Sequence, residues 1–321
     1  MNPLFKSCFI SIGQSTLLLL ILTCSAHSTD TQLNRARQSV VMVRGYTASG
    51  GLAFGSGVVV ANNEVITNCH VLRHTQRAWV TQGRVTYAID SVKADRWHDL
   101  CLVHSEDLHL PVISMGSSNR LQARQRIVSI GHSYGAPKTL LSAGKVQASY
   151  DFDGGKVIKT SARFAIGASG SGIFDMEGRL VGINTFKTPG RKAFFYALPV
   201  EWILALRQYA SETELPIQGQ AFWDSKEHPH PYFMQVAMPE IYGEWEVLLP
   251  IAQAWTQAEP LNTESWHSLG LAYTHLKREE DAEAAYRHAI ALDKGHLESW
   301  FQLGLLGRNQ KNASLSKEVS T

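Results

Sequence analysis

The chain of 321 residues is long enough for about two domains. Hydrophobic side chains make up 44% of it and charged ones 18%, a composition typical of packed cores and not of a long disordered protein. The formal net charge of +2 gives no electrostatic argument for nucleic acid as a partner, and the only long apolar stretch lies at the N-terminus, which excludes a multispan membrane protein.

Residues 1–26 have the pattern of a secretory signal peptide. Lys6 precedes an apolar run that is densest over Leu17–Leu22, and the small residues of Cys24–Ala26 offer a cleavage site. We therefore predict an exported protein, periplasmic or secreted from a bacterium, with no stable membrane insertion after signal cleavage. Retention of the same stretch as an N-terminal anchor is the alternative.

Two cysteines, Cys69 and Cys101, remain after signal removal, because Cys8 and Cys24 lie within the signal. An even pair in an exported chain permits one disulfide, and two buried reduced thiols are the alternative. If the bond forms, it closes a loop of about 30 residues, which contributes roughly 3–4 kcal/mol in the chain-entropy description.

Residues 36–210 are predicted to form one all-β domain. Short β-rich segments are separated by Gly, Asn, Asp and Ser, and no long helices lie between them. This pattern favours antiparallel sandwiches or barrels over an α/β sheet. A helix is predicted to run from about Pro199 to Tyr209. The segments predicted as strands include 39–44, 57–61, 100–103, 126–130 and 180–184.

Residues 211–230 are polar and proline-bearing, and we predict a linker there. The linker contains Glu227, His228 and His230, which are metal-ligating residue types. No further ligands follow at a fixed spacing, so an exposed proline-rich loop is favoured over a metal site.

Residues 231–312 predict stacked helical repeats. A Glu-Ser-Trp motif followed by Leu-Gly begins at Glu264 and again at Glu298, and this period of 34 residues is the length of the tetratricopeptide repeat (TPR). An earlier, degenerate unit is predicted over 231–262, and 313–321 is predicted as a flexible tail. One helical hairpin cannot bury its apolar face alone, so neighbouring units must stack. We expect the module to bind a protein partner; a purely structural role and an unrelated helical pair are the alternatives.

Three segments of the β-rich region contain the residue types that acyl transfer to a hydroxyl group requires. Ser169 is the candidate nucleophile, and His70 is the candidate base that takes its proton. Asp99 is the candidate carboxylate that orients the imidazole. Glycines on both sides of Ser169 allow a sharp turn, in which the N–H groups of Gly167 and Ser169 converge to form an oxyanion hole. This chemistry needs no cofactor and no metal.

Three other interpretations of these residues compete with this one. Ser171 is a second candidate nucleophile, and Asp95 is a second candidate partner for His70, but the local motifs favour Ser169 and Asp99. An α/β-hydrolase requires Gly-x-Ser-x-Gly on a strand–helix turn and a histidine last in the chain. Position 171 is Ser where that motif has Gly, and the surrounding pattern is all-β, so we reject that fold.

The region from about 38 to 205 resembles the trypsin-like (chymotrypsin-fold) serine proteases, and among them the bacterial HtrA/Deg-type branch. Thr67–Val71 is similar to the motif around the catalytic histidine of that family, and Asp99–Leu102 to its Asp-Leu-x-Leu motif. Gly167–Ser171 is similar to its Gly-Asn-Ser-Gly-Gly motif.

This resemblance implies two antiparallel six-stranded barrels with the active site between them. His70 and Asp99 come from the first barrel in this arrangement, and Ser169 comes from the second. Ala168 and Ser171 depart from the usual Asn or Asp and Gly of the family, but neither change removes a catalytic group. TPR units stand in place of the PDZ modules common in the HtrA branch.

The sequence therefore predicts an exported serine endopeptidase that acts on polypeptide substrates, with TPR repeats that recruit protein partners or substrates and no nucleic-acid partner. A catalytically weak or inactive protease-fold scaffold that acts as a protein-binding adaptor is the main alternative, and esterase activity is a third. The segments Thr160–Ile166 and Ala193–Ala197 are expected to line the primary pocket. Because Ser161–Ile166 contains no acidic residue, the pocket is predicted to accept a small or apolar side chain.

Overall fold

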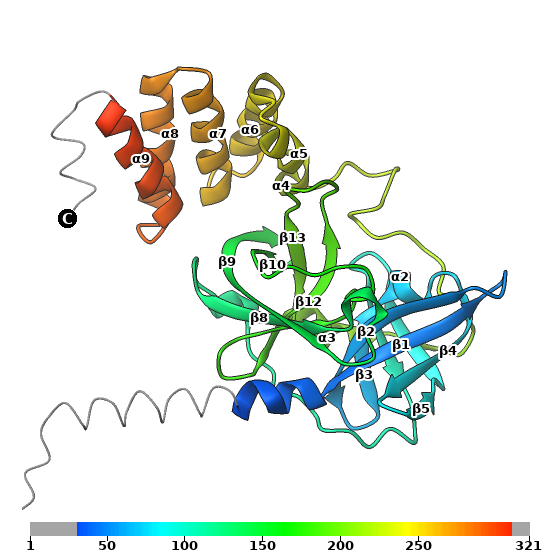
Figure 1. Ribbon diagram of the computed structural model, residues 1–321. Coiled ribbons are helices and arrows are strands. Elements are labelled where there is room, and N and C mark those ends of the chain that lie inside the picture. The colour runs from blue at the N-terminus through cyan, green and yellow to red at the C-terminus, as the bar shows by residue number, and fades with distance from the viewer. Residues whose placement is uncertain (1–30, 310–321) are drawn as a thin grey trace, which may run out of the picture.

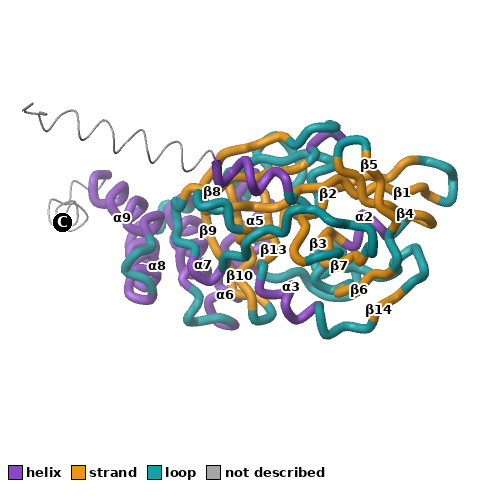
Figure 2. The backbone as a smooth tube through the Cα atoms, turned by 90° about the horizontal axis from the view of Figure 1, so that it is seen from below, coloured by secondary structure: helices purple, strands orange, loops and turns teal. Residues whose placement is uncertain are grey.

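The computed structural model describes residues 31–309. The predicted signal peptide (1–26) and the predicted tail (313–321) lie outside the described residues. Two β-sheet units lie side by side, and a row of helices covers one side of the second unit (Figure 1). Figure 2 gives the same order from another direction, with the helices at one end and the first sheet at the other. The predicted fold class, a chymotrypsin-like all-β domain followed by an all-α repeat module, is confirmed.

Where the family resemblance implied a six-stranded barrel, the N-terminal unit is an open sheet of eight antiparallel strands, with β5 and β14 at its two edges. The short edge strand β14 comes from the chain after the second unit and pairs with β6 through Ser211 and Lys93. An edge strand has unpaired N–H and C=O groups that accept such an addition. In sheet order the strands are β14 (Ser211–Glu212), β6 (Ser91–Asp95), β7 (Leu100–His104), β3 (Glu64–Asn68), β2 (Leu52–Ala61), β1 (Val40–Thr47), β4 (Thr75–Gln82) and β5 (Val85–Ala88).

The second unit is a closed six-stranded antiparallel barrel. β12 is buried along almost its whole length, because it belongs to the wall of the barrel and also faces the first sheet. Val58 and Ile66 of the first sheet share one apolar cluster with Ile183 and Leu198 of the barrel, which holds the two units together. The strands in barrel order are β10 (Gly155–Thr160), β13 (Phe195–Pro199), β12 (Leu180–Lys187), β11 (Gly172–Phe174), β8 (Arg126–Gly131) and β9 (Leu140–Phe152).

The helices outside the repeat module are short. α2 (Cys69–Leu72) follows β3 directly, and residues 31–38 are also helical. The helix predicted from Pro199 to Tyr209 is observed as α3 (Glu201–Leu206). Two 3₁₀ turns complete the set, η1 (Ser118–Arg120) and η2 (Ser133–Gly135).

The repeat module consists of antiparallel helices stacked in chain order (Figure 1). Gly270 of α7 lies so close to the ring of Tyr286 in α8 that a Cβ atom would approach it to 2.5 Å, so glycine permits this helix pair to pack. No helix within residues 31–309 is both long and apolar enough to cross a membrane. The helices are α4 (Tyr232–Gln235), α5 (Ala237–Tyr242), α6 (Trp245–Ala258), α7 (Thr263–His275), α8 (Glu279–Leu292) and α9 (Leu297–Asn309).

The repeat module packs directly on the barrel. Tyr150 of β9 stacks on Phe233 of α4 with ring centroids 4.7 Å apart, and Trp255 of α6 belongs to the same apolar cluster. The preceding segment 211–230, predicted as a polar linker, also contributes buried side chains, Ile217 and Phe222. This segment therefore follows the surface of the β-domain and does not act as a free tether.

Candidate active site

His70 and Asp99 form the closest polar pair of the predicted site. His70 Nδ1 donates to Asp99 Oδ2 over 2.6 Å, and the backbone N–H of His70 donates to Asp99 Oδ1 over 2.8 Å. Asp99 is fully buried, and the side chain of His70 is 24% exposed. Because the carboxylate accepts from Nδ1–H, the other ring nitrogen, Nε2, carries the lone pair that a general base needs.

The Asp99 loop is held from both sides. Asp99 has a positive φ of 57° in the turn between β6 and β7. The side chain of Asn68 donates to the carbonyl of Asp99 over 2.9 Å and to Thr185 Oγ1 of β12 over 2.9 Å. Asn68 immediately precedes α2, which contains His70, so its side-chain amide links the Asp99 loop and the start of α2 to the barrel.

Ser169 lies on a tight turn of the barrel that is pressed against the first sheet. Gly170 has φ +83°, and a Cβ atom there would approach the carbonyl oxygen of Ser56 to 2.2 Å and Thr67 Oγ1 to 2.5 Å. Only glycine fits this contact. The turn thus lies beside the chain that leads into His70, although no hydrogen bond joins Ser169 Oγ to His70 among residues 31–309. In apo enzymes such catalytic hydrogen bonds are often long and tighten when substrate binds.

The two backbone N–H groups predicted for the oxyanion hole have no intramolecular acceptor among the described residues. Ala168 N–H donates to the carbonyl of Ala165 over 2.9 Å, and Gly167 has φ +91°, which is the geometry of a type II turn with glycine at its third position. The carbonyl of Ile166 accepts from Tyr134 N–H over 2.6 Å. Since the C=O and N–H of one peptide unit point in opposite directions, the N–H of Gly167 points away from Tyr134.

Ser56 of β2 supports this turn through two bonds. Its backbone N–H donates to the carbonyl of Ser169 over 2.7 Å, and its Oγ donates to the carbonyl of Gly167 over 2.7 Å. The backbone N–H of His132 in turn donates to Ser56 Oγ over 2.9 Å. The sequence alone assigns no role to Ser56, because a Gly-Ser-Gly segment inside a strand gives no sign of a contact 111 residues away.

The two competing residues are engaged elsewhere. Asp95 accepts from His98 Nδ1 over 2.7 Å and from Tyr209 Oη over 3.3 Å. Burial raises the pKa of Asp95, but these hydrogen bonds outweigh burial and hold the pKa below its ordinary value. Ser171 is fully buried, and its Oγ accepts from Asn184 Nδ2 over 2.8 Å. Neither side chain is hydrogen-bonded to His70 within residues 31–309.

Trp223 is a site residue that the sequence did not reveal. It belongs to the segment predicted as a linker, yet its ring meets His70 edge-on with centroids 5.5 Å apart and stacks on Phe186 at 5.6 Å. The next residue, Asp224, forms an ion pair of 2.8 Å with Arg73, which anchors the segment beside α2. Aromatic content alone does not distinguish such a contact from an ordinary surface tryptophan.

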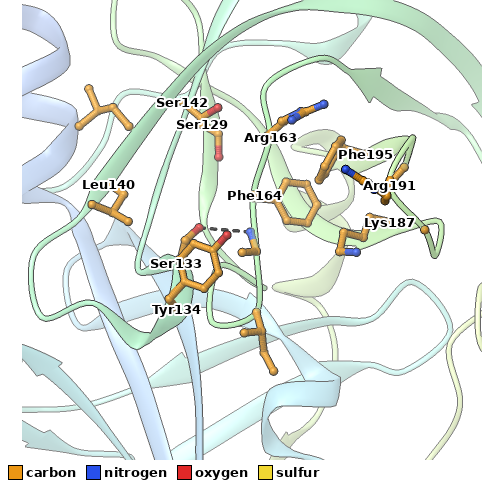
Figure 3. A pocket seen from close by; sticks show the side chains of 15 residues that line it. Ser129, Ser133, Tyr134, Leu140, Ser142, Arg163, Phe164, Lys187, Arg191 and Phe195 are labelled. Atoms are coloured by element: carbon orange, nitrogen blue, oxygen red, sulfur yellow. Dashed lines mark hydrogen bonds between the residues drawn. The ribbon is translucent and has the colours of Figure 1, made fainter.

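A pocket of about 640 Å³ opens beside the turn that precedes Ser169 (Figure 3). Both segments expected to form the primary pocket line it, with Arg163–Ile166 on one wall and Ala193 and Phe195 on another. Phe164 and Phe195 meet edge-to-face with centroids 5.1 Å apart and form an apolar surface in the pocket.

Cys69 and Cys101 are joined by a disulfide, with Cα atoms 4.9 Å apart. The bond links α2, immediately before His70, to β7, two residues after Asp99. It therefore ties together the two segments that carry the imidazole and the carboxylate. Among the residues that the structure describes, no group of three or more His, Cys, Asp and Glu is arranged to hold a metal ion.

Comparison with known proteins places this site in a family context. Residues 55–183 match the family described as trypsin-like peptidase domain, and residues 263–296 match the tetratricopeptide repeat. Serine protease HTR4 of Bos taurus is 31% identical over 185 residues, which are 53% of this chain and 37% of that protein. The protein named "Probable periplasmic serine endoprotease DegP-like" from Hahella chejuensis is 27% identical over 50% of this chain and 36% of its own length. The chain thus spans little more than a third of the curated relatives it matches.

Solved structures show the same fold over the β-domain. The HtrA-type protease AlgW with a tripeptide superposes with a TM-score of 0.51 at 24% identity, over 56% of this chain and 62% of that one. The serine endoprotease from Yersinia pestis gives a TM-score of 0.50 at 24% identity, over 56% and 67%.

Proposed function

We propose, from a chain that carries a trypsin-like peptidase domain similar to HtrA-type proteases and a TPR module, that this protein is a serine endopeptidase. The observation that carries the proposal is the pairing of His70 with a fully buried Asp99, opposite a turn that presents Ser169 and two unbonded N–H groups. That set contains a base, its orienting carboxylate, a nucleophile and oxyanion donors, which together suffice for peptide hydrolysis.

The proposed reaction follows the geometry. His70 Nε2 takes the proton from Ser169 Oγ as the oxygen attacks the peptide carbonyl, and the N–H groups of Gly167 and Ser169 hold the oxyanion. His70 then gives that proton to the amine as the peptide C–N bond breaks, which leaves an acyl-enzyme on Ser169. A water molecule, deprotonated by His70, attacks the acyl-enzyme and releases the carboxylic product, and Ser169 Oγ takes the proton back. Asp99 holds the imidazole in this orientation and stabilises the imidazolium that forms.

The TPR module is proposed to recruit protein partners or substrates. Helices α7 and α9 face the barrel across cavities of about 490 and 340 Å³, and the packing of Tyr150 against Phe233 fixes the module relative to the active site. A partner bound there raises the local concentration of its attached chain near Ser169.

Export to the bacterial periplasm or the exterior is proposed as well. The N-terminal sequence pattern supports it, and so does the disulfide between Cys69 and Cys101, since such bonds persist in oxidising compartments. The DegP-like relative is itself described as periplasmic.

Labelling with a fluorophosphonate tests the catalytic proposal. Protein lacking residues 1–26 is expected to be labelled and to cleave casein, and Ser169→Ala is expected to abolish both. Ser171→Ala is the matched control on the same turn and should keep the label. A correctly folded protein that is neither labelled nor active on casein would instead be the scaffold.

A further inference from the structure

Three cationic side chains line the pocket beside Ser169. They are Arg163, Lys187 and Arg191, and no aspartate or glutamate lines the pocket with them. Within residues 31–309, none of the three forms an ion pair with an acidic side chain. Like charges gathered at one cavity without counter-charges repel one another, so an incoming carboxylate is favoured there.

The remaining surface of the pocket suits the methylene groups of such a side chain. Phe164 and Phe195 supply the apolar part, and Figure 3 shows the three cationic side chains grouped around these two rings. The hydroxyl groups of Ser129 and Ser142 add hydrogen-bond donors from β8 and β9. A ligand with a short apolar stem and an anionic end matches this lining.

The position of the pocket connects it to the proposed chemistry. Ala165 and Ile166 line it, and the next residue is Gly167, whose N–H group has no acceptor within residues 31–309 and is assigned to the proposed oxyanion hole. A substrate with its scissile carbonyl at that N–H therefore places the side chain of the same residue at the pocket mouth.

We propose that this pocket selects polypeptides with an acidic residue at the cleaved position, glutamate in preference to aspartate. The proposal rests on the proposed peptidase function and replaces the expectation of a small or apolar side chain. The sequence around the nucleophile showed only that an acidic wall is missing. Lys187 and Arg191 lie 18 and 22 residues after Ser169 and reach the pocket through β12 and the loop after it.

Glutamate reaches further than aspartate by one methylene group, which places its carboxylate among the exposed cationic side chains while its stem contacts Phe164 and Phe195. Glutamine has the same shape without the charge. A glutamate-to-glutamine comparison therefore isolates the electrostatic part of recognition from the packing part.

The test uses quenched fluorescent peptides that differ only at the cleaved position, with Glu, Gln, Leu or Arg. At low salt, kcat/KM for the Glu peptide is expected to exceed that for the Gln peptide about tenfold, and the ratio should shrink as salt rises. Arg163→Ala and Lys187→Ala should each lower the ratio several-fold. Lys192→Ala, an exposed cation beside Arg191 that does not line the pocket, is the matched control and should leave the ratio unchanged.

A binding measurement separates this inference from the peptidase proposal. Ser169→Ala is expected to bind the uncleaved Glu peptide more tightly than the Gln peptide, as read by fluorescence anisotropy. Equal affinities, or a ratio that survives Arg163→Glu in a protein with an unchanged circular dichroism spectrum, would overturn the acidic preference. If the protein is labelled by the fluorophosphonate but shows no preference for the Glu peptide, the peptidase proposal is supported and the pocket assignment is wrong. If Ser169→Ala binds the Glu peptide more tightly but the wild-type protein is not labelled, the pocket assignment is supported and the peptidase proposal is wrong.

Discussion

Trp223 meets the imidazole of His70 edge-on, with ring centroids 5.5 Å apart and planes at 87°. The tryptophan comes from the chain that connects the β-domain to the helical repeats, 153 positions after the histidine. The segment between the two domains thus contributes directly to the surroundings of the proposed base.

Replacing Trp223 with alanine is expected to lower kcat about three- to tenfold, because one aromatic contact of roughly 0.5–1.5 kcal/mol that holds His70 is lost. Phenylalanine at this position should restore most of the rate. Trp79→Phe, in β4 against Tyr46, is the control. Steady-state kinetics on a casein-derived peptide provide the measurement, and an unchanged kcat in Trp223→Ala would remove this tryptophan from the site.

Asp99→Asn is expected to lower kcat on the order of 10⁴-fold, since an amide can donate to Nδ1 and so favours the wrong imidazole tautomer. Asp95→Asn is the matched control, because Asp95 bonds to His98 and Tyr209 instead. It should cost stability but little turnover. Comparable losses of activity in the two variants would contradict the assignment of Asp99.

Ser56→Ala is expected to lower kcat roughly tenfold while KM changes little, because the carbonyl of Gly167 loses its donor and the oxyanion turn loosens. The unpaired buried groups should also lower the free energy of unfolding by about 1–3 kcal/mol. Ser39→Ala is the control, since that hydroxyl is buried without a hydrogen-bond partner among the described residues. A normal kcat in a destabilised Ser56→Ala protein would limit Ser56 to a structural role.

Removal of the disulfide by a Cys69→Ala and Cys101→Ala double substitution is expected to lower the free energy of unfolding by about 3–4 kcal/mol, given the 32-residue separation of the two cysteines. Urea unfolding measures the loss. Dithiothreitol should produce the same shift in the wild-type protein and none in the double variant. A free energy of unfolding in the double variant equal to that of the oxidised wild-type protein would show that the bond contributes nothing.

The helical module is expected to lose stability on acidification through His267. Burial, with added effects of His296 and Lys159, lowers the pKa of His267 to about 3. In the unfolded chain the pKa of this imidazole is near 6.5, so on acidification the unfolded state binds the proton before the folded state does. The free energy of unfolding therefore falls as the pH drops below about 6.5. At pH 5 the loss from this group is about 2 kcal/mol.

His296 acts in the opposite sense and reduces that loss. Burial lowers the pKa of His296, but its hydrogen bond and ionic interaction with Glu264 raise it above the ordinary value. Thermal midpoints of the wild-type protein at pH 7 and pH 5 measure the sum. His267→Gln should flatten this dependence, and the exposed His288→Gln should not. Equal pH dependence in wild type and His267→Gln would exclude His267 as its source.

The sequence by itself determined the fold class and the presence of the repeat module. Short β-rich segments without long helices between them predict antiparallel sandwiches or barrels, and a period of 34 residues predicts TPR units, because both signals reside in short stretches of neighbouring residues. Short sequence motifs also identified His70, Asp99 and Ser169 as candidates, because each residue lies within a few positions of a strand end or a glycine-containing turn.

Only the tertiary structure decided how these parts meet. Residues far apart along the chain meet at three places. Ser211 pairs with Lys93, and Trp223 approaches His70. Arg163 lines one pocket together with Lys187 and Arg191. Sequence patterns describe which face of a strand or helix is apolar. The register, twist and docking that bring distant faces together depend on the packing of the whole core, and no short segment carries that information.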